Sequence, residues 1–134
     1  MISLERFQKI ILDYVDDGCR TDHGVVFKFE HDRDFSHDVY FEYRYCNEYF
    51  LQISGFAENC KVSVSKLAQA LVYCNNRNYN YRLPYLFINQ NYDLIGTLQA
   101  FLGDNATDNY IIETLKLGCN SIWLAFVKAP NIFQ

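Results

Sequence analysis

The sequence has 134 residues and a net charge of −4, and half of its residues are hydrophobic. A chain of this length suits one domain, residues 1–134, and its 11 tyrosines and 11 phenylalanines exclude a disordered polymer. Residues 1–60 hold 12 acidic and 6 basic residues, so no basic stripe is present for a nucleic-acid backbone, and an anionic membrane surface would repel this half.

The first predicted element is an amphipathic helix over residues 4–15. Its apolar side chains recur every three or four residues, which is the period of one helix face. Ser3 precedes the helix as a suitable N-cap, and Gly18 follows its end. The apolar face consists of Leu4, Phe7, Ile11 and Tyr14.

Three strands are predicted next, over residues 25–30, 39–46 and 49–54, because mainly apolar side chains alternate there with a mixed set of polar and aromatic ones. Asn47 and Glu48 form the predicted hairpin turn between the second and third strands, since asparagine tolerates the positive φ of such a turn. One face of these strands is apolar and the other is mixed. This pattern is typical of an antiparallel sheet with one solvated face.

A second helix is predicted over residues 65–76, followed by a polar connection up to Pro84. Ser63 is its expected N-cap. Its apolar stripe consists of Val64, Leu67, Ala68 and Leu71. Two further strands are predicted over residues 85–89 and 94–102. The inward residues of the last strand are expected to be Leu94, Leu98, Ala100 and Leu102.

The last predicted helix covers residues 108–127, with Thr107 as its N-cap. Gly118 lies in its middle, where glycine costs roughly 1 kcal/mol relative to alanine, so we expect another backbone to approach closely there. The apolar stripe consists of Ile112, Leu115, Cys119, Ile122 and Phe126. Together the elements predict an α+β domain of order α-βββ-α-ββ-α, with one five-stranded antiparallel sheet and helices packed on one face.

The five cysteines are odd in number and contain no C-x-x-C pair, which favours free thiols in a reducing compartment. The N-terminal segment carries charges in its first turns and is not expected to be a signal peptide. No apolar run approaches the ~20 residues that a membrane span needs. We therefore expect a cytoplasmic protein with neither a membrane nor nucleic acid as its partner.

Within the predicted second helix, residues 67–75 form an apolar stretch that ends in Asn75. Residues 85–88 form a predicted aromatic strand, and residues 91–93 form a turn before a long strand. In this order and pattern the chain resembles the YbjN-like family of bacterial sensory-transduction regulators. Leu83 and Pro84 stand where family members commonly have Gly-Lys or Gly-Arg. The resemblance implies the fold of the type III secretion chaperones and a non-catalytic, cytoplasmic protein that binds other proteins and dimerises. It implies no catalytic or cofactor residue.

The segment from His31 to Asp38 is the densest group of candidate metal ligands, with two histidines and three aspartates. Imidazole and carboxylate groups both bind divalent ions. The spacing matches no calcium loop, and the segment lies between two predicted strands, where a charged, solvated loop is expected. We therefore assign no metal and no cofactor. A small-ligand or metal-binding domain centred on this loop remains the alternative function.

Two other segments have a chemical interpretation. Cys19 lies four residues before His23, but no local signature accompanies the pair, so a free thiol is the simpler interpretation and we expect no enzyme. Residues 77–82 combine two arginines with two tyrosines, as a stacking surface for single-stranded nucleic acid does. The acidic balance of the chain favours a polar turn there instead.

The mixed face of the predicted sheet is the candidate binding surface. Aromatic side chains rimmed by charges are typical of protein-binding surfaces, and cross-strand pairing on an exposed sheet explains them equally well. The candidate residues are Val26, Tyr40, Glu42, Arg44, Phe50, Gln52 and Phe56. We therefore predict a non-enzymatic protein-interaction module, chaperone-like or regulatory. Its expected partner is another protein or a second copy of the chain, bound through a sheet or helix surface.

Overall fold

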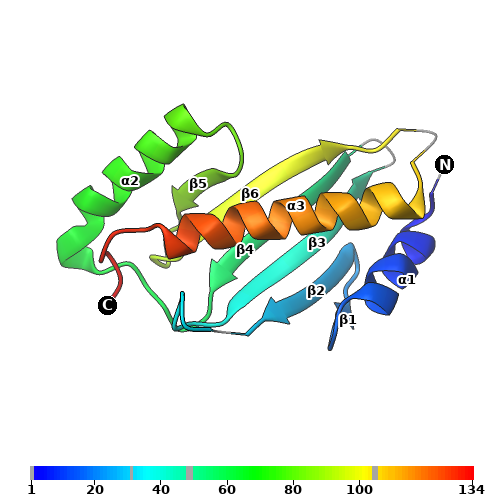
Figure 1. Cartoon of the computed structure of the whole chain (residues 1–134), viewed down its shortest axis with the longest axis horizontal. Coiled ribbons are helices and arrows are strands. Elements are labelled where there is room, and N and C mark those ends of the chain that lie inside the picture. The colour runs from blue at the N-terminus through cyan, green and yellow to red at the C-terminus, as the bar shows by residue number, and fades with distance from the viewer. Residues whose placement is uncertain (1, 31, 48–49, 104–105) are drawn as a thin grey trace.

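The computed structural model describes residues 2–30, 32–47, 50–103 and 106–134. The described residues form three α-helices and six strands of one antiparallel sheet (Figure 1). The helices are α1 (Leu4–Tyr14), α2 (Leu67–Asn80), which follows the 3₁₀ turn η1 (Val64–Lys66), and α3 (Asp108–Val127). The strands are β1 (Cys19–Arg20), β2 (Gly24–Phe29), β3 (Val39–Asn47), β4 (Phe50–Ala57), β5 (Tyr85–Ile88) and β6 (Leu94–Phe101). The α+β class and the single antiparallel sheet are confirmed.

The prediction of five strands is wrong, because the described residues contain a sixth. The two-residue strand β1 pairs with β2, with Cys19 opposite Val26 and Arg20 opposite Val25. Two residues are too few to show the alternation by which strands are recognised in a sequence. The strand order is β1-β2-β3-β4-β6-β5, so β6 lies between β4 and β5. The predicted hairpin turn at Asn47 and Glu48 extends outside the described residues.

α3 crosses the inner face of the sheet, and two glycines let it lie close to the strands. Gly55 on β4 and Gly96 on β6 are opposite each other in register. A Cβ atom on either residue would come within 3.0 Å of Ile122 Cγ2 on α3. Because glycine has no Cβ, the side chain of Ile122 occupies this space instead.

Gly118 in the middle of α3 does not face a neighbouring backbone, contrary to the prediction. A Cβ atom there would lie 2.4 Å from Ile53 Cδ1 and 3.3 Å from Leu98 Cδ2, which are side-chain atoms of β4 and β6. The predicted stripe of α3 also needs one correction, because Ile111 is fully buried and Ile112 is partly exposed. The N-cap at Thr107 and the bounds of this helix are confirmed.

α1 packs on the same inner face and holds the β1–β2 hairpin. The ring of Phe7 meets the ring of Tyr43 edge-on, with centroids 4.9 Å apart. The side-chain amide of the buried Gln8 donates to the carbonyl oxygens of Thr21 and Gly24, at 2.7 and 3.1 Å. Gln8 Oε1 also accepts from Arg20 Nη1 at 2.6 Å. The buried side chain with three partners stabilises the hairpin, because its polar atoms would otherwise be desolvated without compensation.

α2 differs from its prediction in both extent and buried face. The helix continues to Asn80, through residues that were expected to be a polar connection, and Ser63 makes no side-chain cap bond. Val64 and Leu71, predicted to be core residues, are exposed, whereas Ala70 and Cys74 are buried. The reason is the position of α2 beside β5 at the end of the sheet, where a narrow strip of the helix is covered (Figure 1).

Candidate functional site

The outer face of the sheet, defined by side chains that point away from α3, carries all seven predicted surface residues. α1 and α3 pack on the opposite face, and no described element covers the outer one (Figure 1). The register of β2, β3 and β4 brings the seven residues together as Val26 opposite Glu42, Tyr40 opposite Phe56, and Arg44 opposite Gln52, with Phe50 at the end of β4.

An apolar row runs across four strands of the outer face and consists of Tyr40, Phe56, Ile95 and Phe87. Each member is directly opposite the next in register, from β3 through β4 and β6 to β5. The rings of Tyr40 and Phe56 stack with centroids 6.0 Å apart. On β5, the ring of Tyr85 lies beside that of Phe87, with centroids also 6.0 Å apart, and Tyr85 is opposite Thr97 in register. Phe56 is 41% exposed and Tyr85 55% exposed, so cross-strand pairing leaves much of their surface in water.

A hydrogen-bonded polar band lies next to the apolar row. Gln52 Nε2 donates to Thr97 Oγ1 at 3.0 Å, and the hydroxyls of Ser54 and Thr97 lie 3.0 Å apart. These groups satisfy one another, so a partner can cover the band without leaving it unpaired. Beyond the band, Phe50 and Phe101 meet edge-on with centroids 6.2 Å apart. The outer face therefore has apolar contacts at both ends and, between them, a polar band in which Gln52, Ser54 and Thr97 bond to one another.

The charges on the outer face nearly cancel. Its charged side chains along β2 and β3 are Lys28, Glu42 and Arg44. Lys28 Nζ lies 3.7 Å from Asp38 Oδ2, and this carboxylate is the main cause that raises the pKa of Lys28.

Sequence reasoning missed the half of the apolar row that lies on β5 and β6. Ile95 and Phe101 occupy the outward positions of β6, and the alternation of that strand already indicated their direction. The pattern could not show that Ile95 lies beside Phe56, because this contact depends on the pairing of β6 with β4. The strand order therefore determines the length of the row.

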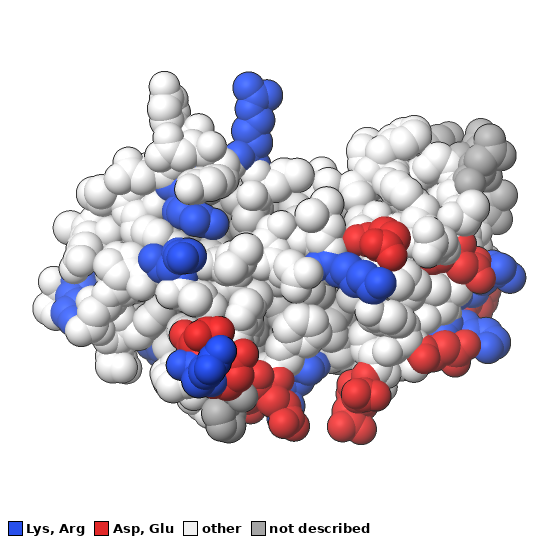
Figure 2. Space-filling model, viewed as in Figure 1, with Lys and Arg blue, Asp and Glu red and all other residues white. Residues whose placement is uncertain are grey.

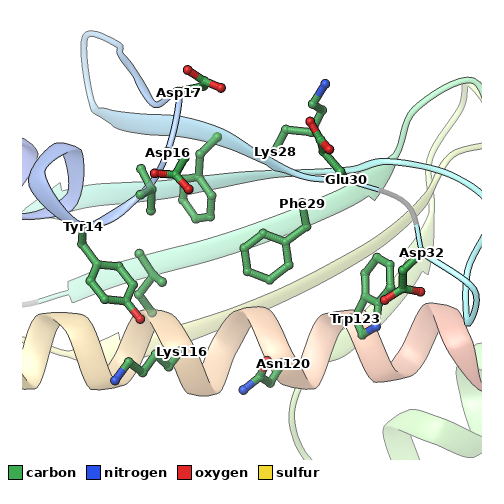
Figure 3. Close-up of a pocket in the computed structure, with 13 residues that line it drawn as sticks. Tyr14, Asp16, Asp17, Lys28, Phe29, Glu30, Asp32, Lys116, Asn120 and Trp123 are labelled. Carbon is green, nitrogen blue, oxygen red and sulfur yellow. The ribbon is translucent and has the colours of Figure 1, made fainter.

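A groove lies on the other side of the sheet, between β2 and α3 (Figure 3). Its volume is about 960 Å³. The apolar part of its wall includes Phe27 and Phe29 from β2, Leu115 and Trp123 from α3, and Val15 after α1. Figure 3 shows the ring of Phe29 directed toward α3, with Tyr14 at one end of the groove and Trp123 at the other. No sequence pattern predicted this groove, because its walls are far apart in the chain.

The groove has an acidic rim, made of Asp16, Asp17, Glu30 and Asp32. No ion pair among the described residues involves these four carboxylates. Figure 2 shows that acidic side chains gather on the part of this surface where α1 and β2 lie, whereas basic ones gather near α2.

The predicted metal loop begins at His31, which lies outside the described residues. Asp32 Oδ1 accepts hydrogen bonds from the backbone N–H groups of Asp34 and Phe35, at 2.8 and 3.2 Å. The ring of Phe35 is buried and meets Trp123 edge-on at 5.7 Å. In the described part of the chain, no group of three or more His, Cys, Asp or Glu side chains is placed to hold a metal ion. The loop is thus anchored by its own turn and by Phe35.

All five cysteines are free thiols. Cys60, Cys74 and Cys119 are buried, and burial raises the pKa of each thiol, to about 11 for Cys60 and Cys74. Cys19 and Cys46 are exposed. A thiol with a raised pKa is a poor nucleophile at neutral pH, because the thiolate is the reactive form.

No protein-family model matches the chain, and no curated protein matches it. The resemblance to the YbjN-like family and the chaperone-like fold that it implies therefore stay predictions. No helix among the described residues is both long enough and apolar enough to cross a membrane.

Proposed function

We propose that the protein is a non-enzymatic interaction module that pairs with a second copy of itself through the outer face of the sheet. The observation that carries this proposal is the apolar row of Tyr40, Phe56, Ile95 and Phe87 on a face that no described element covers. Contiguous exposed apolar side chains rimmed by polar ones mark interaction sites on proteins. Burial of these rings against a partner would remove their apolar surface from water.

The size of the outer face suits a dimer. Six strands spaced about 4.8 Å apart span about 24 Å, and the eight residues of β4 extend about 27 Å. Because β1 has two residues and β5 four, the face is smaller than this rectangle and covers about 600 Å² before the relief of its side chains is counted, against the ~800 Å² per partner of a standard interface.

The chemistry of the outer face favours a second copy of the chain as the binding partner. A two-fold axis that runs along the apolar row would pack Phe56 against the Phe56 ring of the other protomer, as isologous interfaces require. Two acidic chains repel each other, but at the contact itself Arg44 offsets Glu42, and Lys28 is paired with Asp38. The aromatic composition of the row also matches the composition of interface cores.

The proposal places the protein in a reducing, cytoplasmic compartment, with a chaperone-like or regulatory role. Its support is the set of five free thiols, two of which are exposed and would oxidise in a secretory compartment. As a dimer, the module would present two copies of each of its other surfaces.

The test compares the mass of three purified proteins by sedimentation velocity over a range of concentrations. Phe56→Lys places a charge in the apolar row, whereas Leu117→Lys places the same charge on an exposed position of α3, on the helix side. Leu117 is 66% exposed and Phe56 41%, so both variants are expected to fold, which circular dichroism checks.

We expect the wild type and Leu117→Lys to sediment as dimers and Phe56→Lys to sediment as a monomer. A monomeric wild type at all concentrations would contradict the proposal. A Phe56→Lys protein that dimerises as tightly as the wild type would contradict the choice of surface, because a buried unpaired charge is costly.

A further inference from the structure

The two edges of the sheet differ in how far other parts of the protein cover their backbone groups. At the β5 edge, the side chain of Asn78 on α2 donates to the carbonyl oxygen of Leu86 at 2.9 Å and accepts from its N–H at 2.7 Å. One amide side chain thus occupies the place of a neighbouring strand. Exposed strand edges are sites of pairing with other chains, and proteins commonly cover them.

The opposite edge is open along the second half of β2. Backbone N–H and C=O groups of successive strand residues point alternately to the two neighbouring strands. Gly24 accepts from Thr21 N at 2.9 Å and donates to Thr21 Oγ1 at 3.0 Å, so its backbone groups point away from β3. The groups of Lys28, four residues on, point the same way. Among the described residues, β1 pairs with β2 no further than Val26.

The open edge lies along the groove between β2 and α3. A strand added beside Lys28 would place every second side chain toward the groove, because side chains alternate between the faces of a sheet. There it would meet Phe29 and Trp123, both partly exposed. The groove therefore offers backbone pairing and apolar contact at the same position, which are the two parts of peptide recognition by strand addition.

The acidic rim of the groove favours a positively charged binding partner. Four carboxylates line the groove against two lysines, and each lysine already pairs with an acid that is not part of the lining. Lys28 lies 3.7 Å from Asp38, and Lys116 lies 3.2 Å from Glu113. Figure 3 also shows the side chain of Lys28 pointing away from α3. Among the described residues, the groove therefore keeps an excess of negative charge, with Glu30 as the one rim carboxylate that also attracts Lys28.

We propose that this groove binds an extended segment of another protein, in which apolar side chains alternate with lysines or arginines, as an added strand on β2. The inference rests on the proposed function in treating the chain as an interaction module, and it adds a second surface with a defined partner class. Apolar side chains of the segment enter the groove, and its backbone pairs with Lys28. Its cations alternate to the other side of the added strand, the side to which the rim carboxylates of Asp17 and Glu30 point in Figure 3.

The test uses synthetic peptides of about eight residues, a common strand length, in which valine alternates with lysine. Trp123 is the single tryptophan of the chain and lines the groove, so its fluorescence reports binding at this place. A fluorescent label on the peptide gives the affinity independently by anisotropy. One control peptide has glutamate in place of lysine, and another has proline at its centre, which cannot donate to a strand.

Two rim variants, Glu30→Lys and Asp16→Lys, are compared with Glu5→Lys, which makes the same change in net charge on an exposed position of α1 outside the groove. We expect each rim variant to bind the lysine peptide about tenfold more weakly, and Glu5→Lys to bind it almost as the wild type does, because screening limits distant charges. If one rim variant fails to fold, the other carries the comparison.

The expected result is saturable binding of the lysine peptide with a change in Trp123 emission, and much weaker binding of both control peptides. Equal binding of the proline peptide would overturn strand addition. Three results would overturn the site. The first is an equal loss of peptide affinity in Glu30→Lys and Glu5→Lys. The others are binding without any change in Trp123 emission and no binding of the lysine peptide. Phe56→Lys, altered on the other face, should bind the peptide normally, so failure of the dimer leaves this result unchanged.

Discussion

Asn78 provides a quantitative test of how the β5 edge is closed. Asn78→Ala removes two hydrogen bonds to the backbone of Leu86, at 2.9 and 2.7 Å. Each bond contributes about 0.5–1.5 kcal/mol net, so the loss is about 1–3 kcal/mol. Alanine is a better helix former than asparagine by about 0.5 kcal/mol, which offsets part of the loss. The free energy of unfolding should therefore fall by about 0.5–2.5 kcal/mol.

The assay is urea unfolding followed by circular dichroism, with Asn76→Ala as the matched control. Asn76 lies on the same helix and is exposed, so its replacement should leave stability unchanged or raise it by about 0.5 kcal/mol. The exposed β5 edge of Asn78→Ala should also increase aggregation on heating. Equal stability of the two variants would refute the role assigned to Asn78.

Three further predictions test the packing. At neutral pH a thiol reagent should label Cys19 and Cys46 in the folded protein and all five cysteines after unfolding; rapid labelling of a third thiol would contradict the structure. Burial raises the pKa of Tyr43 and of the three buried thiols, so the unfolded state loses their protons first as pH rises. The urea midpoint should hence be steady below pH 9 and fall between pH 9 and 11, and a midpoint that rises there would refute the assignment. Gly24→Ala would place a Cβ 2.1 Å from Tyr43 O and should cost about 3 kcal/mol or more, whereas Gly103→Ala, with its nearest atom at 3.4 Å, should cost little; similar melting temperatures would contradict this.

Local patterns predicted the strands and the direction of their side chains well. The alternation over β3 correctly placed Phe41 and Tyr43 in the core and Tyr40 on the outer face. It succeeded because a strand with one buried face repeats every two residues. The seven outer-face residues were found for the same reason.

Elements defined by tertiary contacts were harder to predict. The end of α2 has a run of asparagines, which favour turns in isolation, yet Asn78 is needed in the helix to close the β5 edge. β1 exists because Gln8 accepts a hydrogen bond from the Arg20 side chain and because the β2 backbone pairs with two residues that have no pattern of their own.

The groove could not be predicted because its parts come from distant segments. Asp16, Phe29 and Trp123 become neighbours once α3 lies across the sheet beside β2. The sequence showed an excess of acid in residues 1–60 but not that four carboxylates border one apolar groove.

The most direct test of pairing through the outer face is the isoleucine methyl NMR spectrum of the wild type at decreasing concentration. Ile95 lies in the apolar row, whereas Ile112 is partly exposed on α3. If the outer face forms the dimer, the Ile95 methyl signals shift on dilution and those of Ile112 stay in place. The account would be contradicted if the Ile112 signals moved while the Ile95 signals stayed in place. It would also be contradicted if the spectrum did not depend on concentration and the protein sedimented as a monomer.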